Sequence, residues 1–294
     1  MLFKETLDRL TWEVKEAVDE IFTTIDQRQT HPNDIVLPKW GWYSEQRMDG
    51  YKPFGPGLGG WDAETEHTQY EFYDSYRRQY VKGSRKVFYT KISSDQKAKK
   101  DIRLSIQMEL MLYLRFWETD RILTKLFHYT QLALGKPFNW QYKLDPDKKN
   151  HLLIREEIRD PLKQICPKYY ALLKKMYKSQ IRNAVAHSQY YITDNHVGFT
   201  NYAPAKHAPF AQESYDWWEE IFHTVILFYN ELIAHEIAIE ERAKRLDQLS
   251  VGAGIEIRYT DPSIQITDIV HWCFDHQRNM WSWGPPRSAS GLYL

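Results

Sequence analysis

The stretch "SQIRNAVAHSQYYI", from Ser179 to Ile192, changes character within a few residues. Its first half is apolar and typical of a helix, and its second half is a run of aromatic, strand-forming residues. Between the two halves stand three different polar side chains, those of Arg182, Asn183 and His187. Helices often end on one basic residue, so three polar groups within six positions call for a second explanation.

These side chains have the chemistry that RNA cleavage without a metal requires. Each helical residue advances by about 100°, so Asn183 and His187 share a face and Arg182 lies about 140° from His187. Histidine titrates near neutral pH and can carry a proton, while arginine has a planar fork of donors that matches phosphate oxygens. Asparagine can donate to a phosphate or orient a neighbouring group. The competing interpretation is structural, because Arg and His near a helix C-terminus also serve capping and the helix dipole, and the bare spacing is common.

The segments around this motif predict a helical bundle. A helix is expected from Pro167 to His187, followed by a hairpin around "TDNH" at 193–196 and a long helix over 213–247. Upstream, residues 93–135 predict one long helix or two in line, opened by a capping box of Ser93 and Gln96 and ended by Gly135.

The rest of the chain predicts additions to this bundle. Apolar spacing indicates a helix over 5–29, and a polar helix is expected over 63–82. Between them, residues 31–62 combine prolines, glycines and tryptophans, which is typical of an ordered aromatic insert. The C-terminal part predicts a strand at 255–259 and a short helix at 267–277. We therefore expect an all-α bundle with a small β-hairpin, divided into an N-terminal elaboration (1–94), a helical core (95–247) and a mixed extension (248–294).

The motif "IRNAVAH", its following hairpin and the next long helix together resemble the HEPN superfamily. The hallmark of that family is R-x(4–6)-H near the end of a helix in an all-α bundle, often with Asn beside the Arg. The resemblance covers about residues 95–247. It implies a metal-independent endoribonuclease that works as a homodimer, with the motifs of two subunits facing each other. Many members are toxins or antiphage effectors, which leaves room for a cognate antitoxin or regulator.

Carried over by motif, the resemblance assigns a role to each polar residue. Arg182 would contact the scissile phosphate, Asn183 would assist it, and His187 would be the general acid or base. An acidic residue on a helix often supports the motif, and Glu109, Glu118 and Asp120 are the candidates. One subgroup has tyrosine two positions after the histidine, but here that position is Gln189. A mechanism based on a modified tyrosine is therefore in doubt.

Composition limits the alternatives. The chain has 294 residues with 39 basic and 39 acidic side chains, so it is not a generally basic nucleic-acid binder and any RNA contact must be local. A basic run before the motif interleaves lysines with tyrosines and could attract a nucleic-acid backbone, although solvated helix faces carry the same pattern. Its members are Lys168, Tyr169, Tyr170, Lys174, Lys175, Tyr177 and Lys178.

Other partners and sites are not expected from the sequence. Cys166 and Cys273 cannot form a disulfide framework, which favours a reducing cytoplasm. The N-terminal stretch carries acids throughout, unlike a signal peptide, and no segment is apolar enough for a membrane span. The spacing of His271, Cys273 and His276 fits no closed zinc site, so we expect no metal centre and no cofactor.

Two other functions fit the same features. The chain could be a non-catalytic HEPN-like module that binds a protein partner or RNA and retains the motif. It could also be a structural dimeric bundle of unrelated ancestry, with the 31–62 insert as its interface. The complete Arg-Asn-His set favours the ribonuclease, because a binding module has no need of all three groups.

Overall fold

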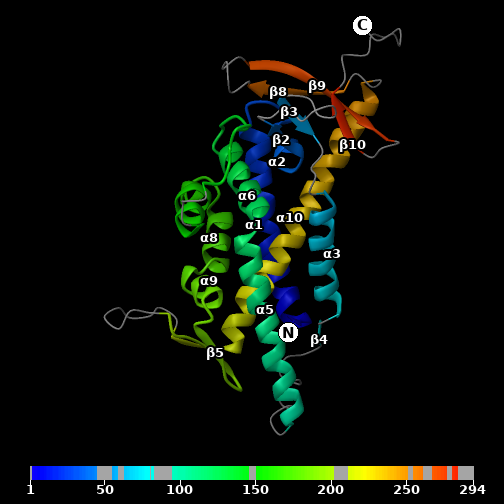
Figure 1. Cartoon of the computed structure of the whole chain (residues 1–294). Helices are drawn as coiled ribbons and strands as arrows, with labels where there is room; N and C mark the ends of the chain where they lie inside the picture. The colour runs from blue at the N-terminus through cyan, green and yellow to red at the C-terminus, as the bar shows by residue number, and fades with distance from the viewer. Residues whose placement is uncertain are drawn as a thin grey trace. The chain divides into compact units, whose positions relative to one another are not determined.

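The structure, a computed structural model, describes residues 2–44, 55–58, 63–79, 81–82, 95–145, 150–201, 211–250, 254–260, 267–276 and 280–283. Over these ranges the chain is mostly helical and carries small sheets (Figure 1). The predicted predominance of helices is therefore confirmed. In the described part of the chain, no helix combines the length and the apolar character that crossing a membrane would require.

The observed helices follow the predicted order. The long helices are α1 (Lys4–Arg28), α3 (Ala63–Gln79), α5 (Gln96–Glu118), α6 (Asp120–Ala133) and α10 (Tyr215–Leu249). The shorter ones are α2 (Leu37–Trp40), α7 (Asn150–Leu152), α8 (Pro167–Met176) and α9 (Ser179–Ala186). A π-helical segment covers Leu153–Arg159, and 3-10 turns cover Asp34–Val36 and Asp160–Leu162. The ends of α1, α3 and α10 lie within three residues of the expected bounds.

Packing divides the chain into two compact units. The first contains Met1–Glu20, Tyr70–Leu123 and Lys149–Glu231, and the second contains Ile21–Gln69, Thr124–Lys148 and Leu232–Leu294. Helices α1, α3, α6 and α10 each contribute residues to both units. The division into 1–94, 95–247 and 248–294 concerns a family core and its additions, which packing does not test, so it stays a prediction.

Helix α5 forms the centre of the core of the first unit. Its buried side chains meet those of α9 and α10, and the set includes Ile102, Ile106, Leu110, Tyr113, Phe116, Trp117, Ile181, Val185, Trp218 and Phe222. Glu109 is fully buried among them. Its carboxylate accepts hydrogen bonds from Tyr76 (3.2 Å), Ser105 (3.1 Å) and the indole of Trp218 (2.9 Å). These donors offset the cost of burying the carboxylate and tie α5 to α3 and α10.

The predicted helix over 93–135 proves to be two helices that meet at Thr119. The backbone of Thr119 is extended (φ −82°, ψ 107°), which ends α5 before α6 begins. Asp95 caps α5, because its side chain accepts from the backbone N–H groups of Lys97 and Ala98. The predicted capping box is therefore wrong, and Ser93 lies outside the described residues. Gly135, with φ +75°, follows α6 where the sequence predicts its end.

The uninterrupted helix predicted from Pro167 to His187 is wrong. Helix α8 ends at Met176 and α9 begins at Ser179, with extended backbone at Tyr177 and Lys178. The hydroxyl of Tyr113 donates to the carbonyl of Met176 (3.0 Å) and accepts from the backbone N–H of Lys178 (2.9 Å). A side chain of α5 thus satisfies two backbone groups that a continuous helix would have paired internally.

The predicted hairpin after the motif is confirmed. Strands β5 (Tyr190–Ile192) and β6 (His196–Phe199) pair antiparallel, and β7 (Gln212–Ser214) adds a third strand that was not predicted. Figure 1 shows this sheet following α9 in the first unit. A short parallel pair, β1 (Leu2–Phe3) with β4 (Val81–Lys82), belongs to the same unit.

The second unit contains a three-stranded antiparallel sheet of β8 (Ile255–Thr260), β9 (Thr267–Asp275) and β10 (Met280–Trp283). The strand at 255–259 is confirmed, but the helix predicted at 267–277 is wrong. Its residues 267–275 form β9, which pairs with β8 on one side and β10 on the other, and residue 277 lies outside the described residues. The described parts of the 31–62 insert include α2 and the pair β2 (Gly41–Ser44) and β3 (Gly55–Leu58).

Candidate active site

Helix α9 ends in a hydrogen-bonded terminus that explains the change of character in the sequence. His187 is the C-cap, Ser188 follows with a left-handed φ of 54°, and the chain then enters β5. The N–H of Ser188 donates to Val185 (3.2 Å) and that of Gln189 to Ala184 (2.7 Å). This pair of bonds is the Schellman arrangement, which satisfies the last carbonyls of a helix. It places His187 at the junction between the helix and the sheet.

Arg182 and Asn183 lie side by side on α9, and the structure brings a third group to them. The Nε of Arg182 forms an ion pair with Glu118 at the end of α5, and its Nη1 donates to the side-chain oxygen of Asn183 at 2.9 Å. The side chains of Arg182 and Glu118 are 23% and 34% exposed, so the pair is accessible from solvent. The hydrogen bond to Glu118 raises the pKa of Arg182, which keeps the guanidinium charged.

Glu118 is the acidic partner that sequence reasoning could not select. Glu109 is fully buried and bonded to Tyr76, Ser105 and Trp218, so its role lies in the core. Asp120 is exposed in the first turn of α6. Of the three candidates, only Glu118 contacts the motif among the residues that the structure describes. It also accepts from the side chain of Asn150 at 3.3 Å.

His187 is placed differently from the other two motif residues. Its backbone N–H donates to the carbonyl of Asn183 (3.1 Å), which fixes its position relative to the helix. Its side chain is exposed and makes no hydrogen bond, ion pair or ring contact with any described residue. The sequence therefore placed all three residues correctly on or at the end of one helix. The structure joins Arg182 to Asn183 and leaves the imidazole of His187 facing solvent.

Tyr177, a member of the basic run before the motif, stands in the break between α8 and α9 and lies next to Arg182. The residue is 6% exposed and its ring packs edge-on against Trp117, with centroids 4.9 Å apart. Its hydroxyl is buried and has no hydrogen-bond partner among the described residues. Burial raises the pKa of this phenol to about 12, while the charges of Arg182 and Arg159 oppose the rise.

The hairpin is tied to the helices that carry the motif. Tyr190 on β5 accepts a hydrogen bond from Gln107 of α5, and Asn201 donates to the carbonyl of Gln180 on α9 at 2.7 Å. The ring of Tyr191 lies over Gly198 on β6, where an added Cβ would meet it at 2.1 Å. These contacts tie the hairpin and the residues after it to α5 and to the first turn of α9.

The basic run before the motif splits into two groups. Lys168 pairs with Glu16 (2.8 Å), and Lys175 pairs with Glu13 and Glu220 (3.0 Å each), so both are bound by acids of the same unit. Lys174 is exposed, and Lys178 donates to the carbonyl of Lys174 at 2.9 Å.

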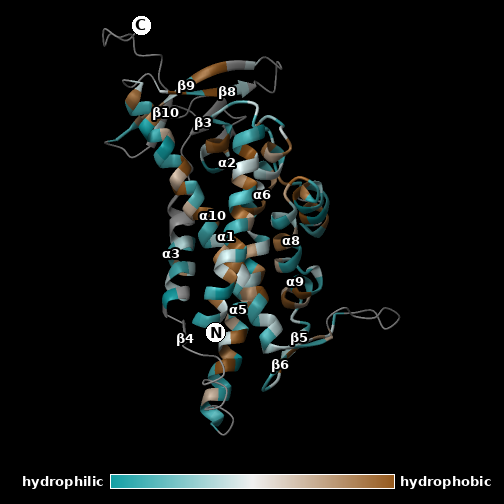
Figure 2. Ribbon diagram, turned by 180° about the vertical axis from the view of Figure 1, so that it is seen from behind, coloured by the Kyte–Doolittle hydropathy of each residue, from teal (hydrophilic) through white to brown (hydrophobic). Residues whose placement is uncertain are grey.

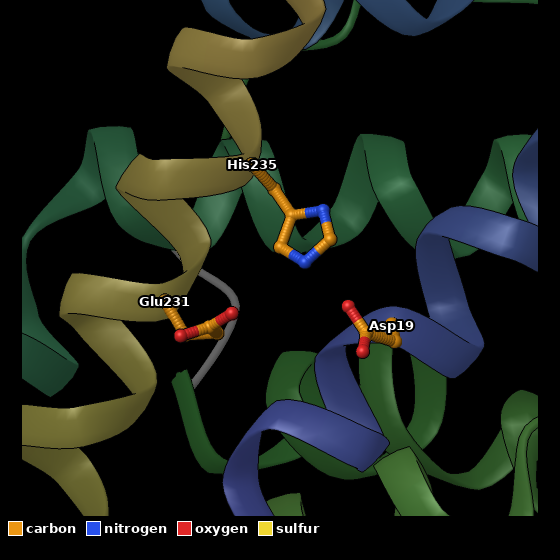
Figure 3. Close-up of side chains that lie close together, drawn as sticks. All are labelled: Asp19, Glu231 and His235. Carbon is orange, nitrogen blue, oxygen red and sulfur yellow. The ribbon is translucent and has the colours of Figure 1, made fainter. Parts of the chain in front are cut away.

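Three possible metal-binding side chains lie elsewhere (Figure 3). Asp19 on α1 and Glu231 on α10 belong to the first unit, and Lys15 Nζ lies 2.9 Å from the former and 3.8 Å from the latter. His235, one turn along α10, belongs to the second unit and stacks on Phe22 with centroids 4.6 Å apart. The single positive charge of Lys15 offsets one of the two negative charges, so an ion pair already accounts for part of the proximity of these carboxylates.

A scan against models of known protein families, a search of curated proteins and a search of solved structures each find no match to this chain.

Proposed function

We propose that this chain is a HEPN-like, metal-independent endoribonuclease with its site at the end of α9. The observation that carries the proposal is the arrangement of a charged, partly exposed guanidinium and an exposed imidazole on one short helix. Arg182 stabilises the negative charge that develops on the phosphate, and His187 accepts or delivers a proton. The attacking group in this reaction is a 2′-hydroxyl, which RNA has and DNA lacks, so the substrate is RNA.

The contacts of Arg182 support a role in binding phosphate. Glu118 holds Nε and Asn183 holds Nη1, so the plane of the guanidinium is set by two partners. The remaining N–H groups, on Nη2 and the second position of Nη1, are those that a phosphate can use. A group oriented before the substrate arrives stabilises a transition state without paying for reorganisation. Glu118 is therefore a positioning residue in this proposal.

A homodimer completes the chemistry. One proton leaves the 2′-hydroxyl and another reaches the departing 5′-oxygen, while each subunit brings one His187. Support comes from α5, where exposed Leu104 (55%), Met108 (46%) and Met111 (43%) share one face. The same face continues to Glu118, the partner of Arg182. Figure 2 shows hydrophobic residues interspersed with hydrophilic ones along α5. An apolar stripe that leads to the motif suits a second copy of the chain.

The biological setting follows from the same proposal. A toxin or antiphage effector of this kind acts on RNA in the cytoplasm, under the control of a cognate antitoxin or regulator. In the described part of the chain neither Cys166 nor Cys273 forms a disulfide, which suits a reducing compartment. Expression in a bacterial host should arrest growth, and His187→Ala should relieve the arrest.

The test is incubation of the purified protein with RNA in EDTA, beside His187→Ala. We expect cleavage that leaves a 2′,3′-cyclic phosphate and a 5′-hydroxyl, with DNA inert because it lacks the nucleophile. His187→Ala should lower the rate by a factor on the order of 10²–10⁴ while unfolding as the wild type does, since its imidazole contacts no described residue. Cleavage that EDTA stops, or that persists without His187, would refute the proposal. RNA binding without cleavage would instead identify the non-catalytic module.

A further inference from the structure

Next to Arg182, a group of basic side chains gathers around the break between α8 and α9. Lys174 stands in the last turn of α8, Lys178 precedes α9, and Arg159 ends the π-helical segment. Burial lowers the pKa of Lys178, and the charges of Lys174 and Arg159 lower it further. The positive charges of Lys174 and Arg159 thus act on the Lys178 ammonium group and disfavour its charged form.

Local structure explains only part of this arrangement. The bond from Lys178 to the carbonyl of Lys174 caps the end of α8, and one edge of the Arg159 guanidinium is held by Asp160 (2.7 Å). Lys178, however, also occupies the N-cap of α9, which has no side-chain cap hydrogen bond. Ser, Thr, Asp or Asn is favoured at an N-cap, and a cation there opposes the positive end of the helix dipole. The position suits an external anion.

A second observation points to a ligand at the same place. The hydroxyl of Tyr177 is buried in a residue that is 6% exposed, has no partner among the described residues, and lies near both Arg159 and Arg182. A buried hydroxyl without a partner costs free energy, which a bound anion or its water can recover.

We propose that Lys174 and Lys178, at the N-terminus of α9, bind a backbone phosphate of RNA next to the one held by Arg182. Tyr177 directly precedes Lys178 in the break between the two helices, and the charge of Arg159 acts on the Lys178 ammonium group. The backbone N–H of Arg182 donates to the carbonyl of Lys178 at 3.1 Å, so the two residues are one helical turn apart, about 6 Å along the helix axis. The inference rests on the proposed function, because it names how that site would hold its substrate beyond the scissile phosphate.

The experiment measures binding separately from cleavage. The probe is a short fluorescein-labelled single-stranded oligouridylate, and the His187→Ala background is used so that the probe stays intact. Anisotropy titrations at several salt concentrations give the slope of log Kobs against log salt. The double variant Lys174→Ala/Lys178→Ala should reduce this slope by about 0.7, the value for one phosphate contact on a single strand, and each single variant should reduce it by less. Lys175→Ala is the matched control, because that lysine is held by Glu13 and Glu220, and its slope should not change.

Circular dichroism and thermal unfolding of each variant separate lost binding from lost structure. If Lys175→Ala lowers the slope as much as Lys178→Ala, the attraction is diffuse and the subsite is refuted. An unchanged slope in Lys174→Ala and Lys178→Ala, or no binding of the probe, also refutes it. If the wild type cleaves RNA but the lysine variants leave the salt slope unchanged, only the subsite is refuted. If the lysine variants lower the slope as expected but the wild type does not cleave RNA in EDTA, only the proposed nuclease activity is refuted.

Discussion

Replacing Arg182 by alanine separates the structural role of this side chain from its proposed chemical role. In the structure Arg182 makes one ion pair with Glu118 and one hydrogen bond with Asn183, and the paired side chains are 23% and 34% exposed. Partly exposed contacts of this kind contribute about 1 kcal/mol together. Removal of a group that stabilises an oxyanion costs roughly 3–4 kcal/mol of transition-state energy, or about 10²–10³-fold in rate. The loss in rate should therefore exceed the loss in stability.

Urea unfolding and RNA cleavage in EDTA measure these two quantities on the same preparations. Glu118→Gln keeps the size of the side chain and removes its charge, so it serves as the matched control. It should cost a similar amount of stability but only about tenfold in rate, because Asn183 still orients the guanidinium. A cycle of Arg182→Ala, Glu118→Ala and the double variant should give a coupling energy of about 1 kcal/mol in stability. If Arg182→Ala cleaves RNA at the wild-type rate, the motif is structural and the site has been misassigned.

Four further results are expected. Ser188→Gly should raise the unfolding free energy by about 0.5–1 kcal/mol, because the left-handed φ of 54° strains serine but not glycine. Urea titrations measure this change, and a decrease in the unfolding free energy would contradict the explanation. Burial lowers the pKa of His128 to about 3, below its unfolded value near 6.5, so the stability that His128 contributes should be complete above pH 6.5 and fall as the pH drops from there toward 3. His128→Phe should flatten that part of the curve of urea midpoints against pH. An equally steep curve would show that other groups cause the loss. Tyr177→Phe should leave stability equal to or about 1 kcal/mol above that of the wild type, since the hydroxyl has no described partner, and a clear loss on thermal unfolding would reveal a bond that the structure lacks. Light scattering should report a dimer that Met108→Glu on the α5 stripe dissociates, whereas an active monomer would exclude catalysis by two facing motifs.

The sequence by itself determined the features that depend on neighbours along the chain. The spacing of Arg182, Asn183 and His187 was sufficient to place them on or at the end of one helix, because helical geometry is local. Gly135 marked the end of α6, since few other residues adopt a left-handed φ without strain. The turn "TDNH" likewise predicted the hairpin of β5 and β6, whose strands are joined by only three residues.

Only the tertiary structure decided the features that depend on partners far away in the sequence. Tyr113, 65 residues before Lys178, bonds the backbone where a continuous helix was expected and so permits the break that separates α8 from α9. Glu118 could not be chosen over Glu109 from the sequence, because both lie on α5. Only packing turns Glu118 toward Arg182, 64 residues later, and Glu109 into the core. Residues 267–275 became β9 because strands stood on both sides to pair with them. In each case the deciding free energy comes from hydrogen bonds and burial that exist only once distant segments have met, and a local pattern does not contain that information.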